Sequence, residues 1–380
     1  MTIAQIKKSV APYLKNISGW RSSRKIVVIE SDDWGSIRMP SAEVYRACLK
    51  AGYGVDQIAY ERYDSVASDQ DLELLFGVLS TLKDRHGNHP VITANVLPAN
   101  PDFKKIEESG FREYHWEPVA STMQRYPEHA RALLLWKEGM KHGLFFPQSH
   151  GREHLNVSRF MEALQRRDRD VMFGFRHGIP GMIPHGKRTE GGNRYVVALE
   201  SSDAAERDAK LPELLEGLDV FEELFGFRSE SFIPPNYLWY SGYDEAMAAA
   251  GVRFYQGNRR MKEPVTGGGV RLNTRRIGSK NQFGQRYLVR NALFEPSLFK
   301  NGISDPVGRC LAQVRAAFRM RKPAVICTHR INYVGFIDPA NRDRNLPMLE
   351  KLLTGILKEW PDAEFMTSVQ LGKLIEEDTQ

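Results

Sequence analysis

The chain has 380 residues, 42% of them hydrophobic, so it is long enough to bury a full core, and its composition excludes a mainly disordered protein. Its formal net charge of +6 favours anionic partners, but the basic clusters lack interleaved aromatic residues and a helix-turn-helix, so nucleic acid is not an expected partner. The three cysteines are far apart and form no CxxC pair, which indicates reduced thiols rather than a disulfide framework.

Residues 1–23 are predicted to be an N-terminal extension that contains an amphipathic helix. Lys7, Lys8 and Lys15 alternate there with apolar residues, and the stretch lacks the continuous apolar run of a signal peptide. No segment reaches the length of a transmembrane helix. We therefore expect a cytoplasmic protein, whose only membrane association would be peripheral contact through this basic helix.

Strand and helix patterns alternate from residue 24 onward. The apolar β-branched run at 25–30 predicts a buried strand, and Ser41 predicts the N-cap of a helix that stops at Gly52. Further helices are predicted at 72–82, 130–142, 158–167, 211–225, 243–250, 307–320 and 346–360, and further strands at 91–96, 144–147, 231–235, 253–255, 324–328 and 365–367.

About seven strand–helix repeats favour one α/β domain over residues 24–380, folded as a distorted (β/α)7 barrel rather than as a doubly wound open sheet. Residues 174–208 and 261–300 do not fit the alternation, and we predict that both are insertions over the C-terminal face of the barrel. The polar residues of interest follow apolar runs, and therefore belong to the end of a barrel where active sites assemble.

Two polar motifs indicate a metal site. Asp32 and Asp33 end the first strand, and His150 and His154 have i, i+4 spacing at the start of a predicted helix, which would direct two imidazoles at one ion. Two neutral imidazoles and one carboxylate suit Zn²⁺ or a similar divalent ion and leave room for water and substrate. Taken singly, each motif has a structural alternative, a capping histidine pair or an ordinary Asp-Gly turn.

A third and a fourth motif complete an ordered set. Phe232-Ile233-Pro234-Pro235 and Thr328-His329 follow the first two, and the four together resemble the motifs of polysaccharide deacetylases of the NodB-homology type, over roughly residues 24–376. The chain looks like a divergent member of that family. The resemblance implies a barrel of the glycoside hydrolase/deacetylase type and the hydrolysis of an N- or O-acetyl group on a sugar.

The resemblance also implies the roles of individual residues. One divalent ion, Zn²⁺ before Co²⁺, Ni²⁺ or Mn²⁺, would be bound by Asp33, His150 and His154. Asp32 would act as the base that takes a proton from the bound water, and His329 as the acid that protonates the departing group. A backbone amide near Asn236 would stabilise the oxyanion.

The chain departs from the family pattern at two places. Ile233 stands where an arginine is usual, and Asn236 stands where an aromatic residue is usual, although Tyr237 follows. Residues 255–259 contain no acidic side chain to support His329, so Glu30, Arg152 or Glu295 would have to rebuild such contacts. The predicted substrate-binding residues are Trp34, Arg152, Pro235, Asn236, Tyr237 and Glu295.

Three functions remain open from the sequence. The leading hypothesis is a deacetylase that acts on an acetylated saccharide during polysaccharide or glycolipid assembly. In one version of this hypothesis the saccharide is linked to a carrier. A metal-independent glycosidase would instead pair Asp32 or Asp33 with another acid such as Glu295. A degenerate barrel that binds sugar without turnover is the third, favoured by the altered third motif.

Overall fold

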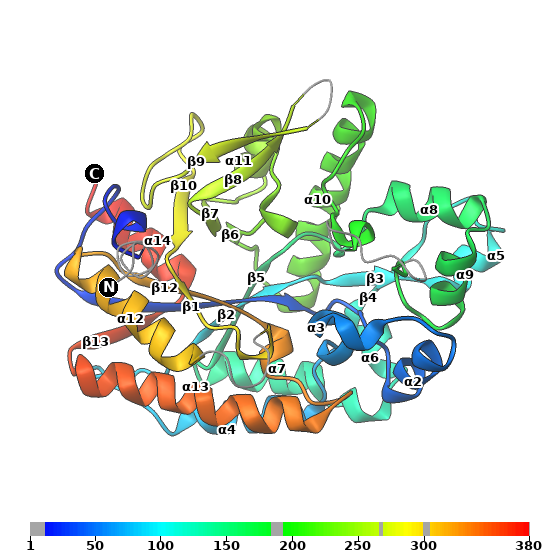
Figure 1. The fold of residues 1–380 in the computed structure, drawn as a ribbon. Helices are drawn as coiled ribbons and strands as arrows, with labels where there is room; N and C mark the ends of the chain where they lie inside the picture. The colour runs from blue at the N-terminus through cyan, green and yellow to red at the C-terminus, as the bar shows by residue number, and fades with distance from the viewer. Residues whose placement is uncertain (1–11, 184–192, 266–268, 299–304, 380) are drawn as a thin grey trace, which may run out of the picture.

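The computed structural model describes residues 12–183, 193–265, 269–298 and 305–379 (Figure 1). Its central sheet contains β1 (Lys25–Trp34), β2 (Ile92–Val96), β5 (Phe145–Ser149), β6 (Ser231–Phe232), β7 (Phe254–Asn258), β10 (Arg286–Arg290), β11 (Ala292–Leu293) and β12 (Ala324–His329). These strands are hydrogen-bonded in the order β10-β7-β6-β5-β2-β1-β12-β11, and all of their pairings are parallel.

The sheet is a nearly closed barrel. β10 and β11 are separated only by Asn291, so one continuous segment pairs with β7 at one end of the order and with β12 at the other. If β10 and β11 are counted as one strand, this strand and the other six give the seven strands of the predicted barrel. The fold class expected from the sequence is therefore confirmed. β13 (Ala363–Met366) pairs with the first half of β1, outside this ring.

Helices lie around the barrel, and the long ones lie close to their predicted positions (Figure 1). The α-helices are α2 (Ala42–Lys50), α3 (Ala59–Tyr63), α4 (Asp69–Ser80), α5 (Phe103–Glu108), α6 (Val119–Gln124), α7 (Ala132–Lys141), α8 (Val157–Gln165), α9 (Arg169–Arg176), α10 (Ala204–Phe225), α11 (Asp244–Ala249), α12 (Pro306–Arg319), α13 (Pro339–Glu359) and α14 (Ser368–Glu377). Two antiparallel pairs lie outside the barrel, β3 (Ala99–Pro101) with β4 (Trp116–Pro118) and β8 (Arg260–Pro264) with β9 (Val270–Thr274).

Two helices begin earlier than their patterns predicted. The expected starts at 211 and 346 lie beside Pro212 and Pro347, which the structure places inside α10 and α13. Proline normally interrupts a helix, so the prediction began each helix next to it. The real N-caps are Asp203 and Asp338, whose side chains accept hydrogen bonds from the backbone N–H groups of the first turn.

The prediction of the second insertion was wrong for part of its length. Residues 261–300 contain the β8–β9 hairpin, which lies outside the barrel, but also β10 and β11, which close it. The Arg286–Arg290 strand is buried throughout, because its Tyr287-Leu288-Val289 run faces the barrel and its surrounding layer. The first predicted insertion, 174–208, contains the end of α9 and the start of α10.

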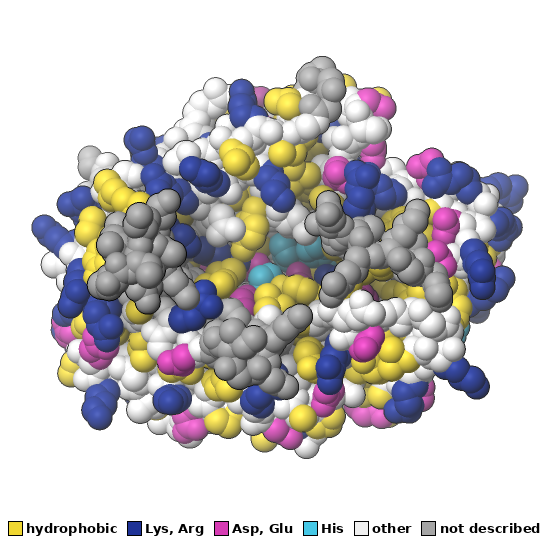
Figure 2. Space-filling view, in the orientation of Figure 1, with side chains coloured by type: hydrophobic (Ala, Val, Ile, Leu, Met, Phe, Trp, Pro, Cys, Tyr) yellow, Lys and Arg dark blue, Asp and Glu magenta, His cyan; other side chains and the backbone are white. Residues whose placement is uncertain are grey.

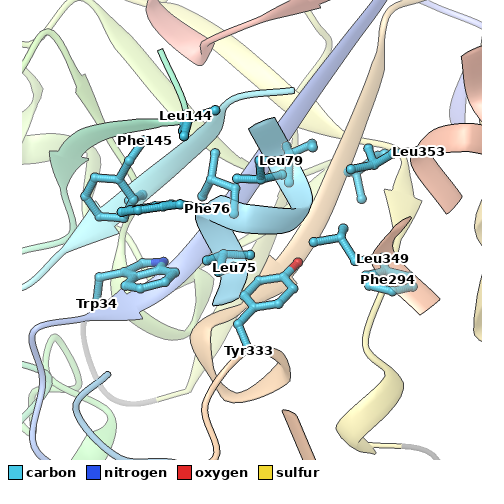
Figure 3. Close-up of a cluster of buried hydrophobic side chains, with 14 of the residues drawn as sticks. Trp34, Leu75, Phe76, Leu79, Leu144, Phe145, Phe294, Tyr333, Leu349 and Leu353 are labelled. Carbon is cyan, nitrogen blue, oxygen red and sulfur yellow. The ribbon is translucent and has the colours of Figure 1, made fainter. Parts of the chain in front are cut away.

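The largest core cluster fills the layer between the barrel and the helices α4, α7, α12 and α13. Figure 3 shows Trp34 and Phe145 from the strands beside Phe76 of α4. The ring centroids of Trp34 and Phe145 are 5.2 Å apart in an edge-to-face contact. This packing fixes the end of β1, where the candidate site begins.

The predicted N-terminal helix falls largely on residues 1–11, which lie outside the described residues. Residues 12–15 are helical, and the chain from there to β1 runs along the bottom of β12, where Ser22 donates its backbone N–H to the Arg321 carbonyl. In the described part of the chain, no helix is long and apolar enough to cross a membrane.

Candidate metal centre and active site

The end of β1 presents two adjacent carboxylates to one cavity. In a regular strand, neighbouring side chains point to opposite faces. Here the register with β2 shifts between Ser31 and Trp34, and Asp33 has a left-handed backbone with φ of 71°. This bulge re-aims Asp33, so that Asp32 and Asp33 both line the cavity at the mouth of the barrel.

Gly35 completes the turn after this pair. Its φ is +88°, and a Cβ at this position would lie 2.4 Å from the carbonyl oxygen of Leu97. Only glycine avoids both the strain and the clash. The Asp-Asp-Trp-Gly sequence therefore carries the geometry of the bulge as well as its carboxylates.

Asp33 lies with His150 and His154 in a compact group. Its Oδ1 is 3.4 Å from Nε2 of His150 and 3.6 Å from Nε2 of His154. One donor atom from each of the three residues lies within 4.8 Å of the others, and all three side chains are buried. One carboxylate and two imidazoles at this spacing fit a divalent ion such as Zn²⁺.

The two histidines come just before α8, the helix that was predicted to follow them. They lie in the irregular loop between β5 and α8, which begins only at Val157. The Nδ1–H of His150 donates to the carbonyl oxygen of Ile233 at 2.7 Å. Nδ1 is therefore the protonated nitrogen, and Nε2 keeps a free lone pair. Burial lowers the pKa of His154 to about 4, which keeps that imidazole neutral as a metal ligand requires.

Asp32 is held by an arginine that the sequence analysis missed. Both oxygens of Asp32 accept hydrogen bonds from Arg290, at 2.7 and 2.6 Å, and Oδ1 also accepts one from Asn95 at 2.7 Å. Burial opposes ionisation of Asp32, but the charge and hydrogen bonds of Arg290 outweigh it and hold the pKa of this carboxyl at about 2. Asp32 is therefore an oriented carboxylate at neutral pH.

Arg290 also binds a second carboxylate of β1. It donates from Nε to Glu30 at 2.6 Å, so one buried guanidinium orders two carboxylates of β1 from the far side of β12. Arg290 ends β10, inside the segment that was predicted as an insertion. The apolar run at 287–289 directly before it was the sequence signal that could have located it.

His329 has an acidic partner of its own. Its Nδ1 contacts Oε1 of Glu295 at 2.5 Å, and its Nε2 lies 3.6 Å from Oδ2 of Asp32. Asn332 donates to the other oxygen of Glu295 at 2.7 Å. Although burial opposes it, the charge and hydrogen bond of Glu295 raise the pKa of His329 well above its usual value. Among the three residues considered for this support, the structure thus brings Glu295 to His329.

The cavity over these residues has a volume of about 440 Å³. Figure 2 shows it as a hollow with histidine and acidic side chains on its floor. The walls include residues that the sequence did not single out: Arg38, Tyr60, Glu61, Asn193 and Lys262. The ring of Tyr60 meets that of His329 edge-on, with centroids 5.7 Å apart.

The loop after β6 contributes Asn236 and Tyr237 to the cavity. Both have left-handed backbones, with φ of 56° and 55°. Among the residues that the structure describes, the backbone N–H of Asn236 has no acceptor, whereas the next N–H, of Tyr237, donates to Pro234 at 3.1 Å. The Tyr237 hydroxyl accepts from Arg290 at 2.9 Å, which joins this loop to the Asp32 network.

Four of the predicted substrate-binding residues do not line the cavity. Trp34 is 1% exposed and packs in the core, with its indole N–H donated to Ser31. Arg152 is buried in ion pairs with Glu153 and Glu216 and stabilises the loop between β5 and α8. Pro235 is buried, and both oxygens of Glu295 are occupied as described above.

The sequence matches no protein-family model and no curated protein. Solved structures are similar in shape at 10% identity: a protein described as a polysaccharide deacetylase from Mycobacterium smegmatis (95% of this chain and 94% of that one, TM-score 0.44) and the peptidoglycan deacetylase PdaC from Bacillus subtilis (94% and 93%, TM-score 0.36). A 4-alpha-glucanotransferase from Thermococcus litoralis is also similar (10% identity, 92% of this chain and 40% of that one, TM-score 0.44). These are likenesses of overall shape alone, shared by the two deacetylases and the 4-alpha-glucanotransferase.

Proposed function

We propose that the chain is a metal-dependent hydrolase that removes an acetyl group from an acetylated sugar. The observation that carries the proposal is that two adjacent aspartates contact different partners. Asp33 faces two imidazole nitrogens, whereas Asp32 faces His329 and is oriented by Arg290. This arrangement supports Asp33 as the metal ligand and Asp32 as the proton acceptor, side by side over one cavity.

Asp33, His150 and His154 would bind the ion. A bound divalent ion polarises an amide or ester carbonyl and lowers the pKa of a water molecule. Asp32 is an ionised, fixed carboxylate, so it would accept the proton of the attacking water. The backbone N–H of Asn236 points to no acceptor in the described part of the chain, and would donate to the oxyanion that develops on the carbonyl.

His329 would supply the proton for the departing amine or alcohol. Glu295 favours its protonated form, and its Nε2 is directed at the cavity side, where Asp32 also lies. The proton that Asp32 takes up therefore has a neighbouring group through which the site can return to its starting state. This arrangement suits amide or ester hydrolysis, in which one group accepts a proton and another donates one.

The glycosidase hypothesis loses Glu295, the acid that the sequence suggested for it, although Glu61 does line the cavity. It needs a second carboxyl group that reaches the substrate. Glu295 is 2% exposed and binds His329 and Asn332 instead of lining the cavity. The hypothesis of a barrel without activity also loses its main argument, because Arg290 and Glu295 supply the two contacts that appeared to be missing from the sequence.

The test combines elemental analysis of the purified protein with acetate release from acetylated mono- and oligosaccharides. We expect about one divalent ion per chain and acetate release that chelation abolishes. His150→Ala with His154→Ala should lose both. His177→Ala is the matched control, because His177 stacks on Phe173 and contacts its carbonyl, away from the cavity lining. Failure to bind Zn²⁺ or Co²⁺ would refute the mechanism. The carrier of the sugar and the cytoplasmic location stay predictions.

A further inference from the structure

A second cavity lies between the N-terminal segment and the barrel, and shares no lining residue with the active-site cavity. Five cationic side chains line it: Lys15, Arg259, Arg275, Arg276 and Lys322. They come from the segment before β1, the two ends of the β8–β9 hairpin and the turn before β12. We call this set the basic cavity. In Figure 1, the N-terminal segment that forms one of its walls lies near α12 and α14.

Among the residues that the structure describes, no acidic residue lines the basic cavity, although the charge of Asp244 interacts with that of Arg275. None of its five cations forms an ion pair with a carboxylate in the described part of the chain, whereas the buried Arg152, Arg290, Arg330 and Arg342 do. Like charges gathered without a partner repel one another, so a bound anion would stabilise this arrangement.

Two of the cations, the buried Lys322 and the half-buried Arg275, are held by contacts inside the protein. Lys322 is 1% exposed, and its ammonium donates to the carbonyl oxygens of Gly19 and Trp20. Burial, helped by the charge of Arg21, lowers the pKa of Lys322 to about 8. Arg275 stacks over the ring of Tyr287 at 4.1 Å, and its Nε is shielded from solvent without a hydrogen-bond acceptor. A buried donor without an acceptor is costly unless a ligand satisfies it.

Neutral side chains hold the walls in place. Asn291 is 4% exposed and donates to Asn16 at 2.8 Å, and Asn16 itself is 3% exposed. Arg259 donates to the Leu14 carbonyl at 3.0 Å, and the backbone N–H of Arg275 donates to the Arg259 carbonyl at 2.7 Å. These contacts fix the N-terminal segment against the hairpin. Arg259, Arg275 and Lys322 are therefore positioned in advance, whereas Lys15 and Arg276 are exposed.

We propose that the basic cavity is an anion site that binds a phosphate group. Several arginines around one point match the oxygens of a phosphate, which can accept paired N–H donors and carries up to two charges. The enclosed part measures only about 10 Å³, so the phosphate would lie at the mouth, between exposed Lys15 and Arg276, with Arg275 beneath it. The group could belong to a soluble phosphate or pyrophosphate ester or to the headgroup of an anionic lipid.

The test is calorimetric titration of the full-length protein with inorganic phosphate and with pyrophosphate. We expect one binding site, and at least a tenfold loss of affinity in the Lys15→Gln/Arg276→Gln variant. Both of these residues are exposed, so the variant should fold. The matched control is Lys137→Gln/Lys351→Gln, which removes the same charge from exposed positions on α7 and α13. Its affinity should equal that of the unmodified protein.

Three results would overturn the proposal: no binding of either anion, an equal loss in the control variant, or loss in the His150→Ala/His154→Ala variant, which would place the anion in the active-site cavity. The last comparison keeps this test independent of the proposed function. Sedimentation with phosphatidylcholine vesicles, with and without phosphatidic acid, separates the two sources. Association that requires phosphatidic acid and is lost in Lys15→Gln/Arg276→Gln identifies a lipid headgroup, and binding of pyrophosphate alone identifies a soluble ester.

Discussion

Arg290 donates hydrogen bonds to both carboxylate oxygens of Asp32, at 2.7 and 2.6 Å, across 258 residues of sequence. The contact joins the end of β10 to the end of β1, and the β10–β11 segment and β1 lie on either side of β12 in the barrel. It orients the proposed base and, through the Tyr237 hydroxyl, the loop that would bind the oxyanion. The predictions below follow from this relationship and from its counterpart between Glu295 and His329.

Replacing Arg290 with lysine should reduce activity without removing the ion. A lysine keeps the positive charge, but its single ammonium cannot reach both oxygens of Asp32 and Glu30 together, as the guanidinium does. Misplacing a catalytic group by about 1 Å can cost roughly 10²-fold in rate, so we expect a loss of kcat of that order. Steady-state kinetics beside elemental analysis check this. An unchanged kcat would mean that the orientation of Asp32 does not matter.

Asp32→Asn should abolish turnover and retain the ion. An amide of the same shape can occupy the space but cannot accept a proton, and general-base catalysis is worth about 10²–10⁴-fold. Asp33→Asn is the matched variant, and it should lose the ion because Asp33 alone of the pair faces His150 and His154. Metal content and acetate release are measured on both. If Asp32→Asn lost the ion and Asp33→Asn kept it, the two roles would have to be exchanged.

Glu295→Gln should move the basic limb of the pH–activity profile to lower pH. Glu295 raises the pKa of His329, so the protonated acid persists above its usual range in the unmodified protein. Without that charge the proton is lost at lower pH, and activity should fall earlier as the pH rises. The same shift affects stability. Because the pKa is raised in the folded state, the stabilisation is complete below the unfolded value of about 6.5 and is lost as the pH rises through the folded pKa.

The control for Glu295→Gln is the acidic limb of the same pH–activity profile. Glu295 does not determine the pH at which this limb falls, so that pH should be unchanged in the variant. Unfolding measured by denaturant at two pH values checks the linkage. The unmodified protein should lose more stability than the variant between neutral and alkaline pH. A profile shifted equally on both limbs, or not at all, would contradict the assignment of His329 as the acid.

Trp34→Phe should lower stability and leave KM unchanged. The side chain lies in the core against Phe145, and its indole N–H donates to Ser31, so the smaller ring leaves a void and an unmatched hydroxyl. We expect the free energy of unfolding to fall by about 1–3 kcal/mol. Denaturant unfolding and the KM for the saccharide, measured on Trp34→Phe and on the unmodified protein, test this prediction. A raised KM with unchanged stability would restore the substrate-stacking role that the structure argues against.

The sequence by itself determined the fold class and the central motif residues. Apolar β-branched runs such as 25–30 report strands, helical spacing and caps such as Ser41 report helices, and their alternation predicts a barrel, because these signals depend on residues close in sequence. The carboxylates and imidazoles were found for the same reason, since each stands directly after an apolar run.

Only the tertiary structure decided how these residues meet. Asp33 joins the cavity because a bulge in β1 turns it, and His150 and His154 converge in the loop between β5 and α8. Arg290 and Glu295 reach Asp32 and His329 from a segment that looked like an insertion. Such partners depend on strand register and on the reach of side chains across the barrel, which no local pattern encodes.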